Sequence, residues 1–180
     1  LLNGSKSFIS GGPTSDIFAV MCRTGGDGPN GVSCLLVEKG TKGLSFGKQE
    51  KKMGWNSQHT SMVNFDNCEI PVDNIVGNEG DGFKIAMKGL DGGRVNIAAC
   101  SLGGARAALE ASINYSAERK QFGKSIDQFQ VTQFKLADMA TELEASRLMV
   151  LRAASSLDAK DKEATKLCAM AKRFTTDICS

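Results

Sequence analysis

The stretch Arg119-Lys120-Gln121-Phe122-Gly123 is the point from which the rest of the sequence is best interpreted. Two cations stand at the end of a long helical pattern, an aromatic residue follows, and Gly123 can supply the left-handed conformation that ends a helix. The helix dipole favours cations at a helix C-terminus, so Arg119 and Lys120 are also explained as ordinary end-of-helix charges. Five residues are too short a motif to decide between these roles, and the flanking sequence is needed.

The chain has 180 residues, of which 41% are hydrophobic, and its formal net charge is +2. This is the composition of a globular protein large enough for one good core or two small ones. A charge so close to balance gives no support for nucleic-acid binding, which needs Lys and Arg clustered on one face. No run of about 18 apolar residues is present, so no membrane span is predicted.

The six cysteines are spread along the chain without a Cys-x-x-Cys pair, and His59 is the one histidine that could join them. Neither a zinc site nor a disulfide framework is therefore predicted. Free and mostly buried thiols fit a reducing compartment inside the cell. His59 and Trp55, each the single residue of its type, are interpreted as structural. The cysteines are Cys22, Cys34, Cys68, Cys100, Cys168 and Cys179.

Residues 1–77 contain short apolar or alternating runs between glycine-rich loops, which predict an antiparallel sheet or open barrel. The turn signal Asn3-Gly4 predicts a hairpin whose first strand is mostly missing. The glycine loop at 25–31 lacks the Gly-Lys-Ser/Thr ending of a phosphate loop and leads into a strand, so a hairpin loop is favoured. The expected strands cover 6–10, 16–23, 32–38, 44–46 and 60–65.

From residue 78 the apolar period changes from two to three or four, which predicts helices. Asp81 can cap a first helix that starts at Gly82, is interrupted at 91–93 and resumes to about Glu118. The sequence 125–128 (Ser-Ile-Asp-Gln) resembles a capping box and predicts the start of a second helix.

The second helix carries two adjoining apolar stripes, which predict contact with more than one neighbouring helix. A third helix is expected to begin near Lys162. The expected fold class is α+β, with an antiparallel β domain at 1–77 followed by an antiparallel helical bundle at 78–180. The first and last residues fall within a strand pattern and a helical pattern, so we expect an internal segment of a longer chain.

Five segments, taken in order, resemble the acyl-CoA dehydrogenase family. The resemblance covers essentially the whole chain, from the middle β domain of that family into its C-terminal helical domain. Each motif alone is weak, whereas five in the order of the family are specific. The segments are Phe8-Ile9-Ser10, Lys52-Met53-Gly54-Trp55, residues 63–72 with Cys68-Glu69-Ile70-Pro71, Gly89-Leu90-Asp91-Gly92-Gly93-Arg94, and Arg119-Lys120-Gln121-Phe122-Gly123.

This resemblance implies an FAD-dependent enzyme that oxidises a short branched-chain acyl-CoA to the 2,3-enoyl-CoA, in the breakdown of valine or of fatty acids. In that family a carboxylate removes the α-proton while hydride leaves for flavin N5, and the flavin carries the redox chemistry. The family also implies electron-transferring flavoprotein as acceptor, a homo-oligomer that is a dimer of dimers, and the mitochondrial matrix or a bacterial cytoplasm. An acyl-CoA oxidase-like flavoenzyme and a non-catalytic assembly module of the same fold are the alternatives.

The resemblance further implies the positions that bind FAD. Phe8, Ile9 and Ser10 match the segment at the flavin ring. Arg119 matches the residue that reaches the pyrophosphate of the FAD in a partner subunit, with Phe122 and the pair Phe129-Gln130 close to the nucleotide. This assignment is chemically reasonable, because a guanidinium binds a diphosphate in a bidentate manner and an aromatic ring suits adenine.

The segment Asp91-Gly92-Gly93-Arg94 matches the part of the family that touches the substrate. Two glycines let the backbone approach a ligand, Asp91 can accept hydrogen bonds, and Arg94 can donate to pantetheine or phosphate oxygens. The residue types alone are explained equally well by a helix kink with a surface ion pair. Some relatives carry a catalytic glutamate just before this arginine, but Gly93 cannot take a proton. The resemblance therefore places the base downstream of Ser180, and no catalytic residue is expected in this chain.

Overall fold

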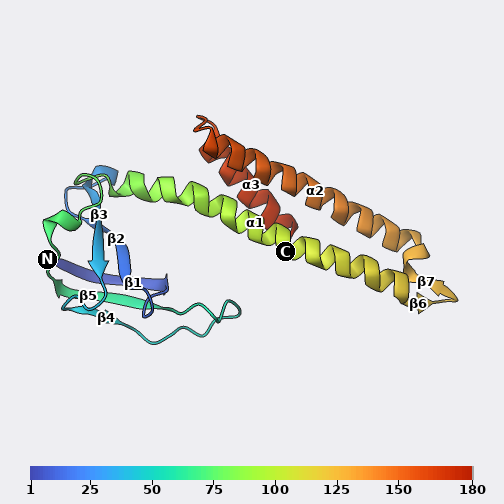
Figure 1. Cartoon of the computed structure of the whole chain (residues 1–180), viewed down its shortest axis with the longest axis horizontal. Helices are drawn as coiled ribbons and strands as arrows, with labels where there is room; N and C mark the ends of the chain where they lie inside the picture. Colours follow the sequence, from blue (N-terminus) through green and yellow to red (C-terminus); the bar gives the residue numbers. More distant parts are fainter. Residues whose placement is uncertain (180) are drawn as a thin grey trace. The chain divides into compact units, whose positions relative to one another are not determined.

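The computed structural model describes residues 1–179, which form two compact units. The first unit, Leu1–Met87, is built from strands, and the second, from Lys88 onward, is helical (Figure 1). Antiparallel strands followed by helices confirm the predicted α+β fold class.

The β unit contains two antiparallel sheets. The glycine loop at 25–31 connects neighbouring antiparallel strands, which confirms the predicted hairpin loop. The Arg23 guanidinium braces that loop, because its Nη1 donates to the carbonyl oxygens of Gly26 and Gly28. One sheet has the order β1 (Leu2–Ser10), β5 (Thr60–Cys68), β4 (Leu44–Phe46), and the other pairs β2 (Ile17–Arg23) with β3 (Val32–Glu38).

Large apolar side chains from both sheets form the core of the β unit. Alternate residues along β2 and β5 point inward, as expected for strands with one buried face. Burying a side chain of this size stabilises a protein by about 1.5–3 kcal/mol, so this shared core holds the two sheets together. The buried members are Leu2, Phe18, Val20, Val37, Val63, Phe65 and Cys68.

The predicted hairpin at Asn3-Gly4 is wrong, because both residues lie inside β1. The Asn3 side chain bonds across the sheet: its Oδ1 accepts from the backbone N–H of Asn67 at 2.8 Å and its Nδ2 donates to Asn67 Oδ1 at 3.2 Å. Gly4 has φ 136° and lies where the pairing of β1 with β5 shifts register. The Asn-Gly pair therefore forms an irregularity in a continuous strand, a position that favours glycine as a turn does.

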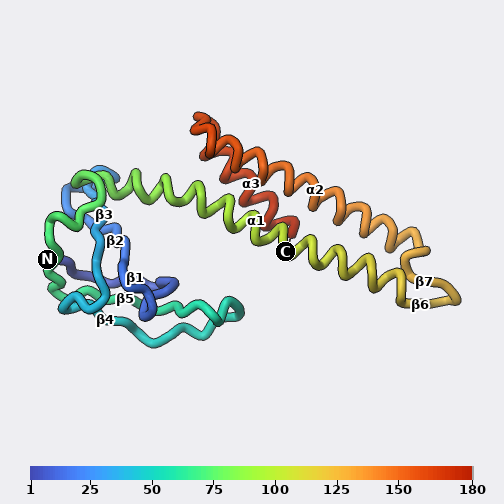
Figure 2. Tube along the Cα trace, viewed as in Figure 1, coloured from blue at the N-terminus to red at the C-terminus, as the bar shows by residue number. Residues whose placement is uncertain are grey.

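As far as residue 179, where the described part of the chain ends, the helical unit contains three helices and one small hairpin. The chain reverses direction at the hairpin between α1 and α2, and again between α2 and α3 (Figure 2). The first six residues of α1 belong to the β unit. The elements are α1 (Gly82–Glu118), β6 (Lys120–Gln121), β7 (Lys124–Ser125), α2 (Gln130–Asp158) and α3 (Ala164–Ile178), with short 3₁₀ turns at Pro29–Gly31, Val72–Asn74 and Ile126–Gln128.

Small side chains line the contacts among the three helices. Ala98 of α1, Ala153 of α2 and Ala171 of α3 are fully buried, and Cys168 is buried beside them. Small residues let helix axes approach closely, and the extensive close contact in this unit is between α2 and α3. Many larger apolar side chains of this unit remain exposed, among them Phe134 at 63% and Leu148 at 54%.

The predicted interruption at residues 91–93 is wrong, because α1 runs unbroken from Gly82 to Glu118. A glycine inside a helix costs about 1 kcal/mol relative to alanine but removes no backbone hydrogen bond. A helix of 37 residues tolerates that cost. Asp81 precedes the helix, but its side chain accepts hydrogen bonds from Asn78, while its carbonyl oxygen accepts the N–H of Ile85.

Gly123 does not end α1, which stops at Glu118. Phe122 and Gly123 together form the two-residue turn between β6 and β7, and their φ values are both positive, 50° for Phe122 and 79° for Gly123. Two successive positive φ values characterise the hairpin turn whose twist matches that of its strands. The expected capping box is also absent: Gln128 Nε2 donates to Ser125 Oγ at 3.0 Å, and the long helix begins later, at Gln130.

Candidate functional site

The first group of candidate residues lies at the end of β1. Between Lys6 and Ile9 the pairing of β1 with β5 shifts register, and Phe8 has φ 57° there. The Phe8 ring is consequently turned outward and is 73% exposed. A bulky side chain in the left-handed region is a conformational outlier that costs of order 1–3 kcal/mol, and such outliers concentrate at binding sites.

Ile9 and Ser10 border a cleft in the β unit. Ile9 packs against the core and is half-buried, whereas Ser10 is exposed at the end of the strand. The cleft has a volume of about 380 Å³ and lies between β1, β2 and β5, with Lys6, Phe18 and Val63 among the residues that line it. A rigid strand therefore presents an outward aromatic ring, an inward aliphatic side chain and a terminal hydroxyl in succession.

The second group surrounds the β6–β7 hairpin. Arg119 follows the last residue of α1, and its carbonyl oxygen accepts the N–H of Ile126, which fixes its position at the base of the hairpin. Its side chain is exposed and forms no ion pair with the described part of the chain. Phe122 is 93% exposed at the tip, where its φ of 50° repeats the outlier seen at Phe8.

Phe129 links the hairpin to the start of α2. Its ring meets Phe122 edge-on at a centroid distance of 6.4 Å, and Lys124 Nζ lies 4.2 Å from its centroid. Gln130 is exposed at the first position of α2, and no side chain caps that helix N-terminus. Cations, aromatic faces and helix N–H groups therefore gather at one place, which is chemistry suited to an anionic nucleotide.

The third group is an ion pair on α1. Arg94 Nη1 lies 2.7 Å from Asp91 Oδ1, and Thr165 of α3 donates its hydroxyl to Asp91 Oδ2 at 2.7 Å. Asp91 is buried and the Arg94 side chain is 33% exposed. Burial raises the pKa of the nearby Cys168 thiol, the charge of Asp91 raises it further, and Arg94 opposes both effects. Cys168 is thus a neutral packing residue.

Gly92 and Gly93 lie beside this pair on an open stretch of α1. A Cβ added at either glycine would meet no heavy atom within 4 Å in the described chain, apart from the backbone of the helix itself. Packing within the chain therefore gives no reason for either glycine, although each weakens the helix. Close approach of a ligand or of another segment is a physical reason for them.

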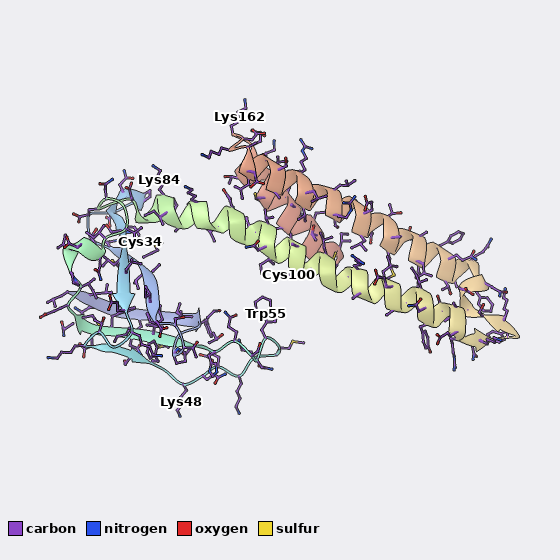
Figure 3. All side chains as sticks on the ribbon, viewed as in Figure 1. Cys34, Lys48, Trp55, Lys84, Cys100 and Lys162 are labelled. Atoms are coloured by element: carbon purple, nitrogen blue, oxygen red, sulfur yellow. The ribbon has the colours of Figure 1, made fainter. Side chains whose placement is uncertain are left out.

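Three further features of the structure are not among the residues predicted from the sequence to form a site. Lys124 follows the Arg119–Gly123 motif directly and could have been considered from its charge. Thr165 is 74 residues from Asp91 and carries no sequence signal. Trp55 was interpreted as structural but is 66% exposed with φ 55°, and it projects from the loop between β4 and β5 (Figure 3).

Lys52 holds the loop that carries Trp55. Its ammonium group donates to the carbonyl oxygens of Trp55 and Gln58, at 2.8 and 2.5 Å, and lies 3.0 Å from Thr60 Oγ1. Three acceptors satisfy all three donors of the ammonium group. Lys52 is therefore a structural cation of this loop.

Other site types find little support in residues 1–179. Three cysteines are buried, two are half-buried and Cys100 is exposed, and all six have free thiols. No group of three or more His, Cys, Asp or Glu side chains is placed to hold a metal ion in the described chain. None of its helices is both long and apolar enough to cross a membrane.

Comparison with known proteins accounts for both units. Residues 1–68 match the profile of the acyl-CoA dehydrogenase middle domain, and residues 80–180 match that of the acyl-CoA dehydrogenase C-terminal domain. The chain belongs to the acyl-CoA dehydrogenase family. The family resemblance drawn from the five sequence motifs is thus confirmed.

Individual relatives of this acyl-CoA dehydrogenase family chain agree in sequence and in structure. It is 59% identical over 179 residues to the mitochondrial isobutyryl-CoA dehydrogenase of Bos taurus, a match that spans 99% of the chain and 43% of the relative. It resembles the structure of butyryl-CoA dehydrogenase from Megasphaera elsdenii with a TM-score of 0.91 and 44% identity, over 98% of this chain and 46% of that one. An FAD complex of PigA matches with a TM-score of 0.93 and 34% identity, again over 98% and 46%. The chain thus spans less than half the length of these relatives.

Proposed function

We propose that this chain forms the flavin-binding and acyl-CoA-binding part of an FAD-dependent dehydrogenase for a short branched-chain acyl-CoA. The observation that carries the proposal is the exposed Arg119, which forms no ion pair with residues 1–179 and lies at the base of the hairpin that carries Phe122. An exposed cation at a helix end contributes at most about 1 kcal/mol, so stability alone gives little reason for this guanidinium.

The β6–β7 hairpin fits the nucleotide end of FAD. Arg119 would hold the diphosphate through two parallel N–H donors, and Phe122 and Phe129 would lie against the adenosine. Gln130, which is exposed at the start of α2, would add a polar contact. In the family this arginine serves the FAD of a neighbouring subunit, so the proposal includes a homo-oligomer, a dimer of dimers.

The end of β1 fits the ring end of FAD. Phe8 and Ile9 would offer apolar contacts, and the Ser10 hydroxyl, exposed and free to rotate, would hydrogen-bond a polar edge of the ring. The bulge at Phe8 fixes these groups on a paired strand, so little ordering is required when the ring binds. When bound, FAD supplies the electron acceptor for oxidation of the acyl chain to the 2,3-enoyl-CoA.

Residues Asp91 to Arg94 form the proposed substrate side. Arg94 would donate hydrogen bonds to pantetheine or phosphate oxygens of the acyl-CoA, next to the open backbone at Gly92 and Gly93. Gly93 has no titratable group, so the general base is proposed to lie downstream of Ser180. The bovine relative, named isobutyryl-CoA dehydrogenase, supports isobutyryl-CoA as the substrate and valine breakdown as the pathway.

The remaining parts of the proposal follow the family. Electrons would pass to an electron-transferring flavoprotein, and the protein would reside in the mitochondrial matrix, or in the cytoplasm of a bacterium. The mitochondrial relative supports the first of these locations.

The test is the colour and the redox behaviour of the full-length protein. We expect it to purify with bound FAD and to bleach when isobutyryl-CoA is added without oxygen, more readily than with straight-chain butyryl-CoA. A colourless protein that still self-associates would indicate an assembly module instead. Rapid reoxidation by air with release of peroxide would indicate an oxidase.

A further inference from the structure

The Asp91–Arg94 pair has a third member that belongs to another helix. Asp91 Oδ1 accepts a hydrogen bond from Arg94 Nη1, and Asp91 Oδ2 accepts one from the hydroxyl of Thr165, each at 2.7 Å. Both oxygens of a buried carboxylate are therefore bound within the chain. Asp91 has little capacity left for a ligand, whereas Arg94 uses one of the five N–H donors of its guanidinium.

The two bonds on Asp91 have different structural consequences. An Asp–Arg pair three residues apart on one helix constrains its carboxylate weakly, because both side chains belong to the same element. The bond from Thr165 comes from α3 and approaches the other oxygen, so it fixes the rotation of the carboxylate between two helices. The orientation of the guanidinium follows, since it is bonded to that carboxylate.

We propose that Thr165 and Asp91 are positioning residues, which hold the Arg94 guanidinium in the orientation that binds the pantetheine or phosphate oxygens of an acyl-CoA. This inference rests on the proposed function and deepens it: Arg94 touches the substrate, and α3 sets its geometry. The 33% exposure of the Arg94 side chain leaves its remaining donors accessible, and the open backbone at Gly92 and Gly93 leaves room beside them.

The surroundings support a fixed ion pair. Cys168, one turn after Thr165 on α3, is fully buried, and the charges of both Asp91 and Arg94 act on its thiol. Thr165 itself is exposed, so replacing its hydroxyl disturbs little packing. Loss of that hydroxyl therefore tests the orientation of the Arg94 guanidinium more than it tests the stability of the fold.

The experiment uses the full-length flavoprotein with coenzyme A as the probe, titrated calorimetrically, together with steady-state kinetics on isobutyryl-CoA. Thr165→Val should weaken coenzyme A binding and raise KM by about three- to tenfold, the range expected for one hydrogen bond. kcat and flavin content should stay close to wild type. Thr165→Ser, which keeps the hydroxyl, should behave as wild type.

Two further variants separate positioning from general structure. Thr176→Val is the matched control on α3, because the Thr176 hydroxyl donates to the carbonyl oxygen of Lys172 in its own helix, and it should have no effect. In an Arg94→Ala background, Thr165→Val should add nothing, since the group that it positions is gone. Should Thr165→Val prove unstable, Asp91→Asn, which keeps an oxygen for Thr165 but loses the charge, should weaken coenzyme A binding at least as much.

The outcomes are distinguishable. A protein without flavin contradicts the proposed function. A flavoprotein in which Arg94→Ala weakens coenzyme A binding but Thr165→Val does not, or in which the two effects add, overturns the positioning role alone. A flavoprotein in which Arg94→Ala itself is neutral overturns the role of the whole triad and leaves FAD binding intact.

Discussion

The β unit and the helical unit bury different kinds of side chain. The β unit closes over large apolar groups, with Val37 and Val63 almost completely buried and Phe65 at 6% exposure. The core of the helical unit consists of three alanines and a cysteine beside Val150, while Phe134, Leu148 and Leu151 stay more than half exposed. The stability of the β unit therefore depends on the packing of large apolar side chains, and that of the helical unit on the packing of smaller side chains where its helices meet.

The two units also differ in the chemical groups that surround their exposed phenylalanines of positive φ. Each presents a phenylalanine at positive φ, Phe8 in one unit and Phe122 in the other. The cleft beside Phe8 carries the neutral hydroxyl of Ser10 and one cation, Lys6, whereas the hairpin of Phe122 carries two cations, Arg119 and Lys124. A hydroxyl can hydrogen-bond a flavin ring and cations can bind a diphosphate, which is the chemical reason for the proposed assignment of one end of FAD to each unit.

The largest expected effect concerns the core of the β unit. Phe65→Ala should destabilise the full-length protein by about 3–5 kcal/mol, because the cavity left by a buried ring cannot collapse fully. Scanning calorimetry measures the change. Phe134→Ala on α2 is the matched control, and it should cost less than about 1 kcal/mol if its ring stays exposed. An equal loss of unfolding free energy in the two variants would contradict this difference between the units, because another part of the protein would then have to cover Phe134.

An intermediate effect is expected at the hairpin. Arg119→Ala should weaken FAD binding by about 10- to 150-fold, since a charge-assisted hydrogen bond contributes about 1.5–3 kcal/mol. The retained flavin, measured by absorbance after dialysis, reports the loss, and the unfolding temperature should change little. Arg106→Ala is the control, because its guanidinium is paired with Glu110 on an exposed face of α1. Equal retention in both variants would mean that Arg119 is an ordinary end-of-helix charge.

Much of the fold could be predicted because local patterns specify it. The apolar runs predicted as strands at 16–23 and 60–65 and the change of period after residue 77 follow from which faces are buried, and the structure confirms strands and helices there. Glycine is the residue whose local signal is most ambiguous here. The sequence predicts a turn at Gly4, a helix break at Gly92 and a helix end at Gly123, but these residues lie in a strand, a helix and a hairpin turn.

The candidate site was less accessible to sequence reasoning, for a physical reason. The sequence motifs identify Phe8, Asp91 and Arg119 as candidate site residues. The backbone conformation and the contacts between helices then determine how the side chains of these residues are held. The left-handed φ of Phe8 depends on a register shift against β5, and the Asp91–Thr165 bond depends on how α1 and α3 pack. Neither feature is encoded in residue types near the motif, so both appear only once the chain is folded.

The smallest expected effect on stability is at Ser10, where the signal is spectroscopic. Ser10→Ala should change the free energy of unfolding by less than about 0.5 kcal/mol, because the residue is exposed. It should still shift the visible absorbance of the bound flavin, since a hydrogen bond to the ring alters its electronic levels. Ser5→Ala is the control: Ser5, on the same strand, donates to Asn64 across the sheet and should leave the spectrum unchanged. If both variants kept the wild-type spectrum while FAD stayed bound, β1 would not be the ring-side contact, and the assignment of one FAD end to each unit would fail.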